Sequence, residues 1–405
     1  MKKLRIAVIT MEFITEPYFS GGVANHFYRK FRSIAERGHE VHIFTHSDKN
    51  EPPFDFNGLQ IHRVQGSSSS GRFKRLFDRL RRNSFAKTSL WLNFSFHVSR
   101  RIRKVHQKLP FDLIQCPNSY GCGLFSRLLI PIPLVTNVSC YRPVWNKLGQ
   151  IERTFDMRMI EKLEWLQYRF SRFIYSPSQI LQKILKEEAK IFNVEVIRTP
   201  IFQETYELDP KIYRENLMGK EYLLFFGRYQ LHKGFHILAQ ALPAVLEAFP
   251  EANAVFVGKD VSSMLAPSMK DYAIQRAGDY AHRLIFFDQI KHEQLYPIIS
   301  HARIVVLPSL IDNLPNTLME TMLLEKPVIG TIGASFDELI TEGENGFLVP
   351  SNDPVSLAEK IIAVWPRKDL KYIGQRAKEK AYELAPEKTI QHLLQYYEKV
   401  IGQGG

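Results

Sequence analysis

The most informative segment of the chain is Phe225-Phe226-Gly227-Arg228-Tyr229-Gln230-Leu231-His232-Lys233-Gly234. An apolar run typical of a buried strand ends at Gly227, and Gly234 opens a pattern with helical spacing. Arg228 and Lys233 are therefore expected at a strand end. A diphosphate suits such a position, because a guanidinium can bind phosphate oxygens in pairs, a lysine adds a mobile charge, and a helix N-terminus offers free N–H groups.

A second segment, Asp312 to Glu320, carries two carboxylates on either side of a polar loop. The loop itself consists of Asn313, Leu314, Pro315, Asn316 and Thr317, and a Leu- and Met-rich helical pattern follows it. Carboxylates accept hydrogen bonds from sugar hydroxyls. One acid could therefore bind a hexose and the other a ribose, while the loop amides face phosphates.

Strands and helices alternate along the chain of 405 residues in two blocks. In the first block the expected strands are Ile6–Thr10, Val41–Thr45, Asp112–Gln115, Pro133–Asn137, Phe173–Tyr175 and Val194–Ile197. In the second they are Tyr222–Phe226, Ala254–Val257, Leu284–Phe287, Ile304–Leu307, Val328–Gly330 and Gly346–Val349. Such alternation predicts an α/β fold with parallel sheets wrapped by helices.

The expected domains are residues 1–199 and 200–385, followed by a helix over 386–405 that either crosses back to the first domain or completes the second. Residues Thr199–Lys220 have no clean period and are expected to be a linker. In the first domain a helix from Val23 to Arg37 should follow the loop that contains Gly21 and Gly22. Further on, Ser176-Pro177-Ser178 is expected to start a helix with the proline just inside it.

Parallel sheets bind ligands at the carboxyl ends of their strands, where these motifs fall. Without a Cβ, Gly21 and Gly22 would allow the backbone to approach a diphosphate or an acceptor, although a Gly-Gly pair before a helix is commonly just a tight turn. His26, one helical turn later, could face a cleft or pack in the helix stripe. Glu338 could contact a ligand, or it could be a carboxylate stabilised by a helix dipole.

In this order the motifs resemble the retaining nucleotide-sugar glycosyltransferases of family 4, which have the GT-B fold. In that family the second domain opens with a strand, Gly-Arg-Leu, a spacer and Lys-Gly-x-x-x-Leu. Here Gly227-Arg228, Lys233-Gly234 and Leu238 match that phrase. The family's Glu-x7-Glu corresponds to Asp312 and Glu320, and the resemblance spans nearly the whole chain.

The resemblance implies two Rossmann-like domains whose parallel sheets face each other across a cleft, with the acceptor on the first domain and the nucleotide sugar on the second. It makes Arg228, Lys233, Asp312 and Glu320 the catalytic set. It assigns donor binding to Gly21, Gly22, Gly227, Glu338 and the loop Asn313–Thr317. No cofactor is implied besides the substrate, a UDP- or GDP-sugar.

Two departures from the family pattern stand out. Asp312 occupies a position where the family usually has Glu, so its reach is shorter by one methylene. The family's acceptor-side histidine, in a phrase like Val-Thr-x-His, is absent from Leu134-Val135-Thr136-Asn137-Val138-Ser139-Cys140-Tyr141-Arg142. Asn137, Ser139 or Arg142 could supply a polar contact instead.

The resemblance also implies transfer with retention and without a metal ion. The residues agree, since Arg228 and Lys233 can neutralise charge that builds on a leaving diphosphate, and the sequence contains no Asp-x-Asp metal-binding signature. The sequence offers no strong candidate for a carboxylate nucleophile on the acceptor side. Same-face attack, with the leaving phosphate helping to take the acceptor proton, is therefore expected.

Charge is unevenly divided along the chain. Residues 1–200 hold 33 Lys and Arg against 16 Asp and Glu, whereas residues 201–405 hold 21 against 26. Part of the excess lies in Arg72–Arg82, where apolar residues recur at helical spacing opposite the cations. This pattern fits a surface helix packed on its own domain or an interfacial helix on anionic lipid. Nucleic acid is disfavoured, because no aromatic platform accompanies the charge.

Composition favours a cytoplasmic protein, peripheral to the inner membrane face if the basic segment binds lipid. No run of about 18 apolar residues is present, and Glu12 comes too early for a signal peptide. Cys116, Cys122 and Cys140 lack metal-type spacing, so free thiols in a reducing compartment are expected.

The expected acceptor is a lipid-linked or other anionic glycan precursor of polysaccharide or glycoconjugate biosynthesis. Transfer to a soluble small molecule is the second enzymatic option. From another class, a GT-B scaffold could bind a sugar nucleotide or a partner protein without catalysis, and hydrolysis of the donor would separate the two. A sugar-nucleotide epimerase of the same architecture is disfavoured, since such enzymes lack the Gly-Arg to Lys-Gly phrase in this form.

Overall fold

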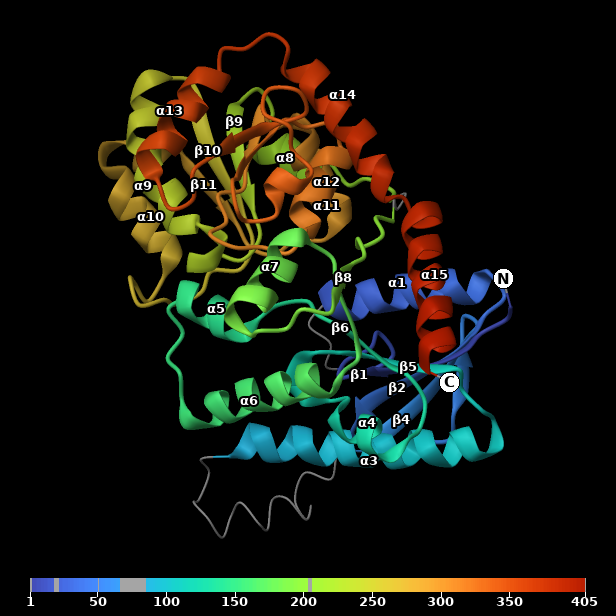
Figure 1. Cartoon of the computed structure of the whole chain (residues 1–405). Coiled ribbons are helices and arrows are strands. Elements are labelled where there is room, and N and C mark those ends of the chain that lie inside the picture. The colour runs from blue at the N-terminus through green and yellow to red at the C-terminus, as the bar shows by residue number, and fades with distance from the viewer. Residues whose placement is uncertain (1, 18–21, 50, 66–84, 203–205, 405) are drawn as a thin grey trace. The chain divides into compact units, whose positions relative to one another are not determined.

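The computed structural model describes residues 2–17, 22–49, 51–65, 85–202 and 206–404, and the chain divides into two compact units (Figure 1). Unit 1 comprises Met1–Pro143, Glu152–Pro200 and Pro386–Gly405. Unit 2 comprises Val144–Ile151 and Ile201–Ala385. The Arg72–Arg82 segment lies outside the described residues.

Unit 1 is built on a sheet whose described part has eight strands in the order β3-β4-β2-β1-β5-β6-β7-β8. All neighbours pair in parallel except β3 and β4, which form an antiparallel hairpin. The strands are β1 (Arg5–Thr10), β2 (Glu40–Ser47), β3 (Phe54–Phe56), β4 (Leu59–Gln65), β5 (Leu113–Pro117), β6 (Leu134–Asn137), β7 (Phe173–Ser176) and β8 (Val194–Val196).

Helices cover both faces of the unit 1 sheet. They include α1 (Gly22–Glu36), α3 (Ala86–Lys108), α4 (Leu124–Leu129), α6 (Phe155–Phe170), α7 (Gln179–Glu188) and α15 (Pro386–Gly404), and α5 (Arg142–Leu148) begins at the end of the unit's first segment. Alternate residues of β1 enter opposite cores, Ile6 and Val8 facing α1 and α15, and Ala7 and Ile9 facing α3. The last helix of the chain therefore belongs to the core of unit 1.

Unit 2 contains a parallel sheet of six strands in the order β11-β10-β9-β12-β13-β14. These are β9 (Glu221–Phe226), β10 (Ala252–Val257), β11 (Leu284–Phe287), β12 (Ile304–Val306), β13 (Val328–Thr331) and β14 (Phe347–Val349). The surrounding helices include α8 (Lys211–Asn216), α9 (Phe235–Ala248), α10 (Met269–Ala277), α11 (His292–His301), α12 (Asn316–Leu323), α13 (Pro354–Val364) and α14 (Leu370–Ala381). Both faces of β9 are buried, which explains its continuous apolar sequence.

The strands expected from the sequence are confirmed in both units, with shifts of one or two residues at their ends. Two expectations were wrong. The presumed linker contains α8, for which Pro210 is the N-cap residue. Pro177 lies before its helix rather than inside it, because the hydroxyl of Ser178 caps α7 by accepting a hydrogen bond from the amide of Leu181 at 3.2 Å.

The β3–β4 hairpin was not predicted. Its turn, Asn57-Gly58, places both residues at positive φ, 53° and 82°, which is the conformation that such two-residue turns require. In the described part of the chain, no helix is both long enough and apolar enough to span a bilayer.

Candidate active site

Two glycines hold the carboxyl ends of β9 and β10 together in unit 2. Gly227 follows β9 with a φ of 130°, and Gly258 follows β10 with a φ of 149°. A Cβ on Gly258 would lie 2.0 Å from the carbonyl oxygen of Gly227. The two strand ends can therefore approach this closely only because Gly258 has no side chain.

A third glycine brings the two sequence motifs into contact. Gly234 has a φ of 70°, and a Cβ there would lie 1.7 Å from the carbonyl oxygen of Pro308, which follows β12. Next to this contact the amide of Leu310 donates a hydrogen bond to the carbonyl of His232 at 2.8 Å. The segment after β9 thus packs on the segment after β12, at the carboxyl ends of neighbouring strands.

Lys233 and Asp312 form an ion pair across this contact. Lys233 Nζ lies 2.6 Å from Asp312 Oδ2, which also accepts a hydrogen bond from the Ser309 hydroxyl at 3.2 Å. The other carboxylate oxygen accepts the amide of Asn313 at 3.0 Å. Both carboxylate oxygens of Asp312 therefore have partners, and one of these partners is the Lys233 ammonium.

Arg228 lies in the same loop with its side chain exposed. Among the described residues, its guanidinium has no hydrogen-bond or ion-pair partner. The pKa of His232 is sensitive to the charge of this loop: burial, together with Lys233 and Arg228, lowers the pKa to about 4 against the opposing effect of Asp312. His232 is therefore neutral near pH 7, and the loop carries two cations that can meet an anion.

The loop from Asn313 to Thr317 leads into α12 beside the end of β9. Pro315 is the N-cap of α12, and its carbonyl accepts the amides of Leu318 and Met319 at 3.0 and 3.3 Å. The amides of the first helical residues have no acceptor within the helix, as at any helix N-terminus. Thr317 lies close to Gly227, since a Cβ on that glycine would be 3.9 Å from Thr317 Cγ2.

Glu320 lies on α12 and approaches the start of α11. Its Oε1 is 3.4 Å from Nε2 of His292, whose ring stacks on Tyr206 with centroids 5.5 Å apart and packs edge-on against Tyr296. His292 and Tyr206 were missed by sequence reasoning. The only signal in the sequence was an aromatic residue in each of two segments far apart in the chain, which is too weak to select them.

The segment before Glu338 contacts the acidic loop from another strand end. The amide of Leu314, a residue at φ 51°, donates to the hydroxyl of Ser335 at 3.0 Å. Glu338 itself is half-buried at the end of a short 3₁₀ helix, Phe336–Glu338. It is therefore near the loop in the fold but not in the first turn of an α-helix, so the helix-dipole interpretation was wrong.

The remaining predicted positions lie in unit 1. Gly21 is outside the described residues, and Gly22 begins α1. Asn137 ends β6, is 8% exposed, and has no partner for Oδ1 in the described part of the chain. His26 is partly buried, and burial, then Lys30 and Arg29, lowers its pKa to about 3.

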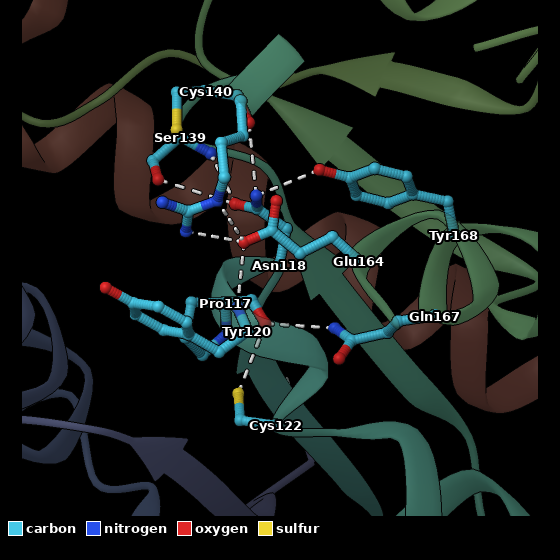
Figure 2. Close-up of polar contacts among 10 residues, drawn as sticks. Pro117, Asn118, Tyr120, Cys122, Ser139, Cys140, Glu164, Gln167 and Tyr168 are labelled. Carbon is cyan, nitrogen blue, oxygen red and sulfur yellow. Dashed lines mark hydrogen bonds and ion pairs between the residues drawn. The ribbon is translucent and has the colours of Figure 1, made fainter. Parts of the chain in front are cut away.

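Val138 stands at the position where the family's histidine was expected. The next residue, Ser139, belongs to a polar network centred on Asn118. Figure 2 shows Asn118 between Ser139, Cys140 and Tyr168. Asn118 accepts the Ser139 amide at 3.0 Å, and it donates to the Cys140 carbonyl at 3.1 Å and to the Tyr168 hydroxyl at 2.9 Å. The backbone after β6 is therefore fixed by the loop after β5.

Arg142 is held by Glu164 rather than left open. Its Nε and Nη2 donate to Glu164 Oε1 at 3.1 and 2.7 Å, and its guanidinium lies 4.7 Å from the ring centroid of Tyr120. The Tyr120 amide donates to the same oxygen at 2.8 Å. Glu164 is 2% exposed, and burial raises its pKa although Arg142 opposes the shift. This ion pair therefore fixes the backbone at Tyr120 and the start of α5.

Two family profiles match most of the chain. The family described as Glycosyltransferase Family 4 matches residues 20–202, and the one described as Glycosyl transferases group 1 matches residues 220–366. The first span falls in unit 1 and the second in unit 2, apart from a few residues.

This chain belongs to the glycosyltransferases. An uncharacterized glycosyltransferase of Methanocaldococcus jannaschii is 24% identical over 403 residues, covering 94% of each chain. A phosphatidyl-myo-inositol mannosyltransferase of Mycobacterium leprae is 28% identical over 149 residues, which is 36% of this chain and 37% of that protein.

Solved structures establish the fold of this glycosyltransferase as GT-B. Sucrose-phosphate synthase of Thermosynechococcus elongatus superposes with a TM-score of 0.75 at 19% identity, over 99% of this chain and 100% of that one. HepE of Anabaena in complex with UDP-glucose superposes with a TM-score of 0.68 at 17% identity, over 97% and 98% of the two chains. In the present glycosyltransferase Arg228, Lys233, Asp312 and Glu320 all lie inside the matched group 1 span.

Proposed function

We propose that this glycosyltransferase transfers a hexose from a UDP- or GDP-sugar to a lipid-linked or other anionic glycan precursor, with retention and without a metal ion. The observation that carries the proposal is the Lys233–Asp312 ion pair beside the exposed, unpartnered guanidinium of Arg228, in the part of the chain that the structure describes. It combines cations suited to a diphosphate with a carboxylate suited to sugar hydroxyls at one end of a parallel sheet.

The diphosphate binds Arg228 and Lys233 in this proposal. Departure of a nucleoside diphosphate builds negative charge on the β-phosphate, and two fixed cations stabilise that charge where many other enzymes use a divalent ion. The neutral state of His232 keeps a third charge out of the loop. Gly227 and the first amides of α12, together with Glu338, line the nucleotide.

The hexose contacts Asp312 and the ribose contacts Glu320. Binding of the diphosphate supplies Lys233 with a new anionic partner, so the Asp312 carboxylate is released to accept hydrogen bonds from sugar hydroxyls. The His292 contact orients Glu320 for the ribose, and the stacked rings of Tyr206 and His292 offer a flat apolar surface nearby.

The chemical step is a same-face substitution at the anomeric carbon. The bond from this carbon to the β-phosphate oxygen breaks, the bond to the acceptor oxygen forms on the same face, and the acceptor proton moves to an oxygen of the leaving phosphate. Charge therefore balances without a protein nucleophile, and Arg228 and Lys233 stabilise the leaving group throughout.

The donor and acceptor classes rest on chemistry and on relatives. HepE binds UDP-glucose, and the mycobacterial relative is a phosphatidyl-myo-inositol mannosyltransferase. The first 200 residues hold 33 Lys and Arg against 16 Asp and Glu, which favours an anionic acceptor at the inner membrane face.

The test is a panel of UDP- and GDP-sugars with EDTA present, read by thermal shift and by donor hydrolysis, with and without lipid extract. Stabilisation and turnover by one donor, lost in Arg228→Ala and kept in Arg276→Ala, is the expected result. Stabilisation without turnover under every condition would identify a binding scaffold instead. Turnover only after a divalent ion is restored would reject the metal-independent mechanism.

A further inference from the structure

A small cavity inside unit 1 contains a buried lysine that the proposed function does not use. The cavity has a volume of about 20 Å³, enough for a water molecule or a small ion. Its wall includes His26, Lys30, Asn137, Tyr175, Arg198 and Thr199, and none of the described residues that line it is an Asp or a Glu.

Lys30 lies on the apolar face of α1, at a position where the helix pattern would place a hydrophobic residue. It is 3% exposed, and its Nζ is 4.5 and 4.8 Å from the ring centroids of Phe27 and Phe31. Within the described residues its only polar partner is the Tyr175 hydroxyl at 3.3 Å. A protonated amine has three N–H groups, so two of them lack an acceptor among the described residues.

None of the described residues that line the cavity carries a negative charge. Burial raises the pKa of Tyr175 and of Tyr396 and Tyr397 on α15, so these phenols remain neutral. His26 on the same helix is neutral as well, and Arg198 adds a second cation to the wall. Asn137 adds one acceptor to the wall, because its Oδ1 has no partner in the described part of the chain. The charged groups that the described lining contributes are the cations Lys30 and Arg198.

We propose that this cavity binds one small inorganic anion of the size of chloride, held by the Lys30 ammonium with Arg198 as the second positive group. An anion supplies the missing acceptor for Lys30 and offsets a charge that is otherwise buried without a partner. Burial lowers the pKa of Lys30 to about 7. A bound anion favours the protonated amine, so near neutral pH anion binding is accompanied by proton uptake at Lys30.

The position of the cavity gives the anion a structural role. Its wall contains Ile197–Pro200, the last residues before the chain leaves unit 1, and Thr389 and Leu393 of α15, just after the chain returns at Pro386. A bound anion therefore ties α1 to both segments through which the chain passes between the units. The inference is independent of the sugar donor and acceptor.

The first experiment measures thermal unfolding of the full chain at pH 6 in chloride, bromide or gluconate at constant ionic strength. Wild-type protein should unfold on the order of 3 °C higher in either halide than in gluconate. Lys30→Met, which fills the same space without a charge, should lose the difference, and Lys183→Met, which removes an exposed lysine, should keep it. At pH 9, where Lys30 is neutral, the difference should shrink in the wild type.

A shift of equal size in Lys30→Met would show a general salt effect and overturn the proposal, as would equal stability of the wild type in all three salts. The second experiment locates the ion directly. Crystals grown in bromide should show an anomalous peak within hydrogen-bonding distance of Lys30 Nζ. A cavity with no such peak at saturating bromide holds water or nothing, and the proposal fails.

Discussion

The Lys233 ammonium lies 2.6 Å from Asp312 Oδ2, although the two residues are 79 positions apart in the chain. A diphosphate that binds Lys233 must compete with this carboxylate. In the proposed function, the same displacement frees Asp312 for the sugar, so that donor binding and sugar contact are coupled through one ammonium group.

Asp312→Asn should separate nucleotide binding from turnover. Removal of the carboxylate charge leaves Lys233 without a competitor, so the dissociation constant of free UDP or GDP should stay the same or fall. Loss of the sugar contact should lower turnover by about 10²-fold. Calorimetry with the nucleotide and steady-state kinetics with its sugar check the two halves, and nucleotide binding that weakens tenfold would contradict the coupling.

Arg228→Ala should remove activity and leave stability unchanged. The guanidinium is exposed and has no polar partner among the described residues, so its loss breaks no contact of the fold. Its contribution to the leaving diphosphate should appear as a fall of about 10²- to 10³-fold in turnover. Arg276→Ala, an exposed arginine on α10, is the matched control for both turnover and melting temperature, and near-normal turnover in Arg228→Ala would reject the assignment.

Gly234→Ala should destabilise unit 2 strongly. The new Cβ would meet the Pro308 carbonyl oxygen at 1.7 Å, so β9 and β12 would have to separate at their carboxyl ends. We expect a loss of at least about 3 kcal/mol in the free energy of unfolding. Gly333→Ala has a similar φ of 77° but no atom within 4 Å of its Cβ, and it should cost about 1 kcal/mol. Equal losses in denaturant titrations would show that the close contact is unimportant.

His236→Phe should make unit 2 less sensitive to acid. Burial lowers the pKa of His236 on α9 to about 4, and its Nδ1 has no partner within the described residues. The neutral histidine therefore contributes its full stability above pH 6.5 and loses it as the pH falls from 6.5 to 4, by about 2–3 kcal/mol. Urea titrations at pH 7 and pH 4.5 should give a smaller difference for the variant, and an unchanged difference would place the acid sensitivity elsewhere.

Arg142→Met should destabilise unit 1 by about 3–5 kcal/mol, because it leaves the buried carboxylate of Glu164 without a cation. The double variant Arg142→Met/Glu164→Gln should recover much of that loss, since no buried charge remains. Recovery measured by thermal unfolding would show that Arg142 serves the fold. A double variant no more stable than the single one would contradict this account.

The sequence pattern predicted all six described strands of the unit 2 sheet and six of the eight described strands of the unit 1 sheet. A strand such as β9 is buried on both faces, and its continuous apolar sequence indicates this burial. β3 was missed because it has only three residues, and α8 because its six residues bury no side chain. β4 has seven residues, but the buried polar residue His62 interrupts its apolar alternation. Short elements leave no period to detect.

The residues of the proposed donor site could be selected from the sequence where they stand close together in the chain. One short segment contains Gly227, Arg228, Lys233 and Gly234. In the structure, Lys233 of this segment forms an ion pair with Asp312. The partners of Glu320 were not predictable, since His292 and Tyr206 reach it only through the packing of distant segments. Lys30 differs, because the sequence shows directly that a lysine interrupts the apolar stripe of a helix. Its lack of a negatively charged partner depends on the surrounding tyrosines, which only the structure shows.

The return of α15 to unit 1 sets an order on folding during synthesis. Ile390, Leu394 and Tyr397 are fully buried in the same core as β1, and burying each such side chain contributes about 1.5–3 kcal/mol. Ribosomes complete all of unit 2 before they make these residues. The first half of the protein to emerge is therefore the last to reach its final stability, and a chain truncated after Ala385 should expose unit 1 to proteases while unit 2 stays resistant.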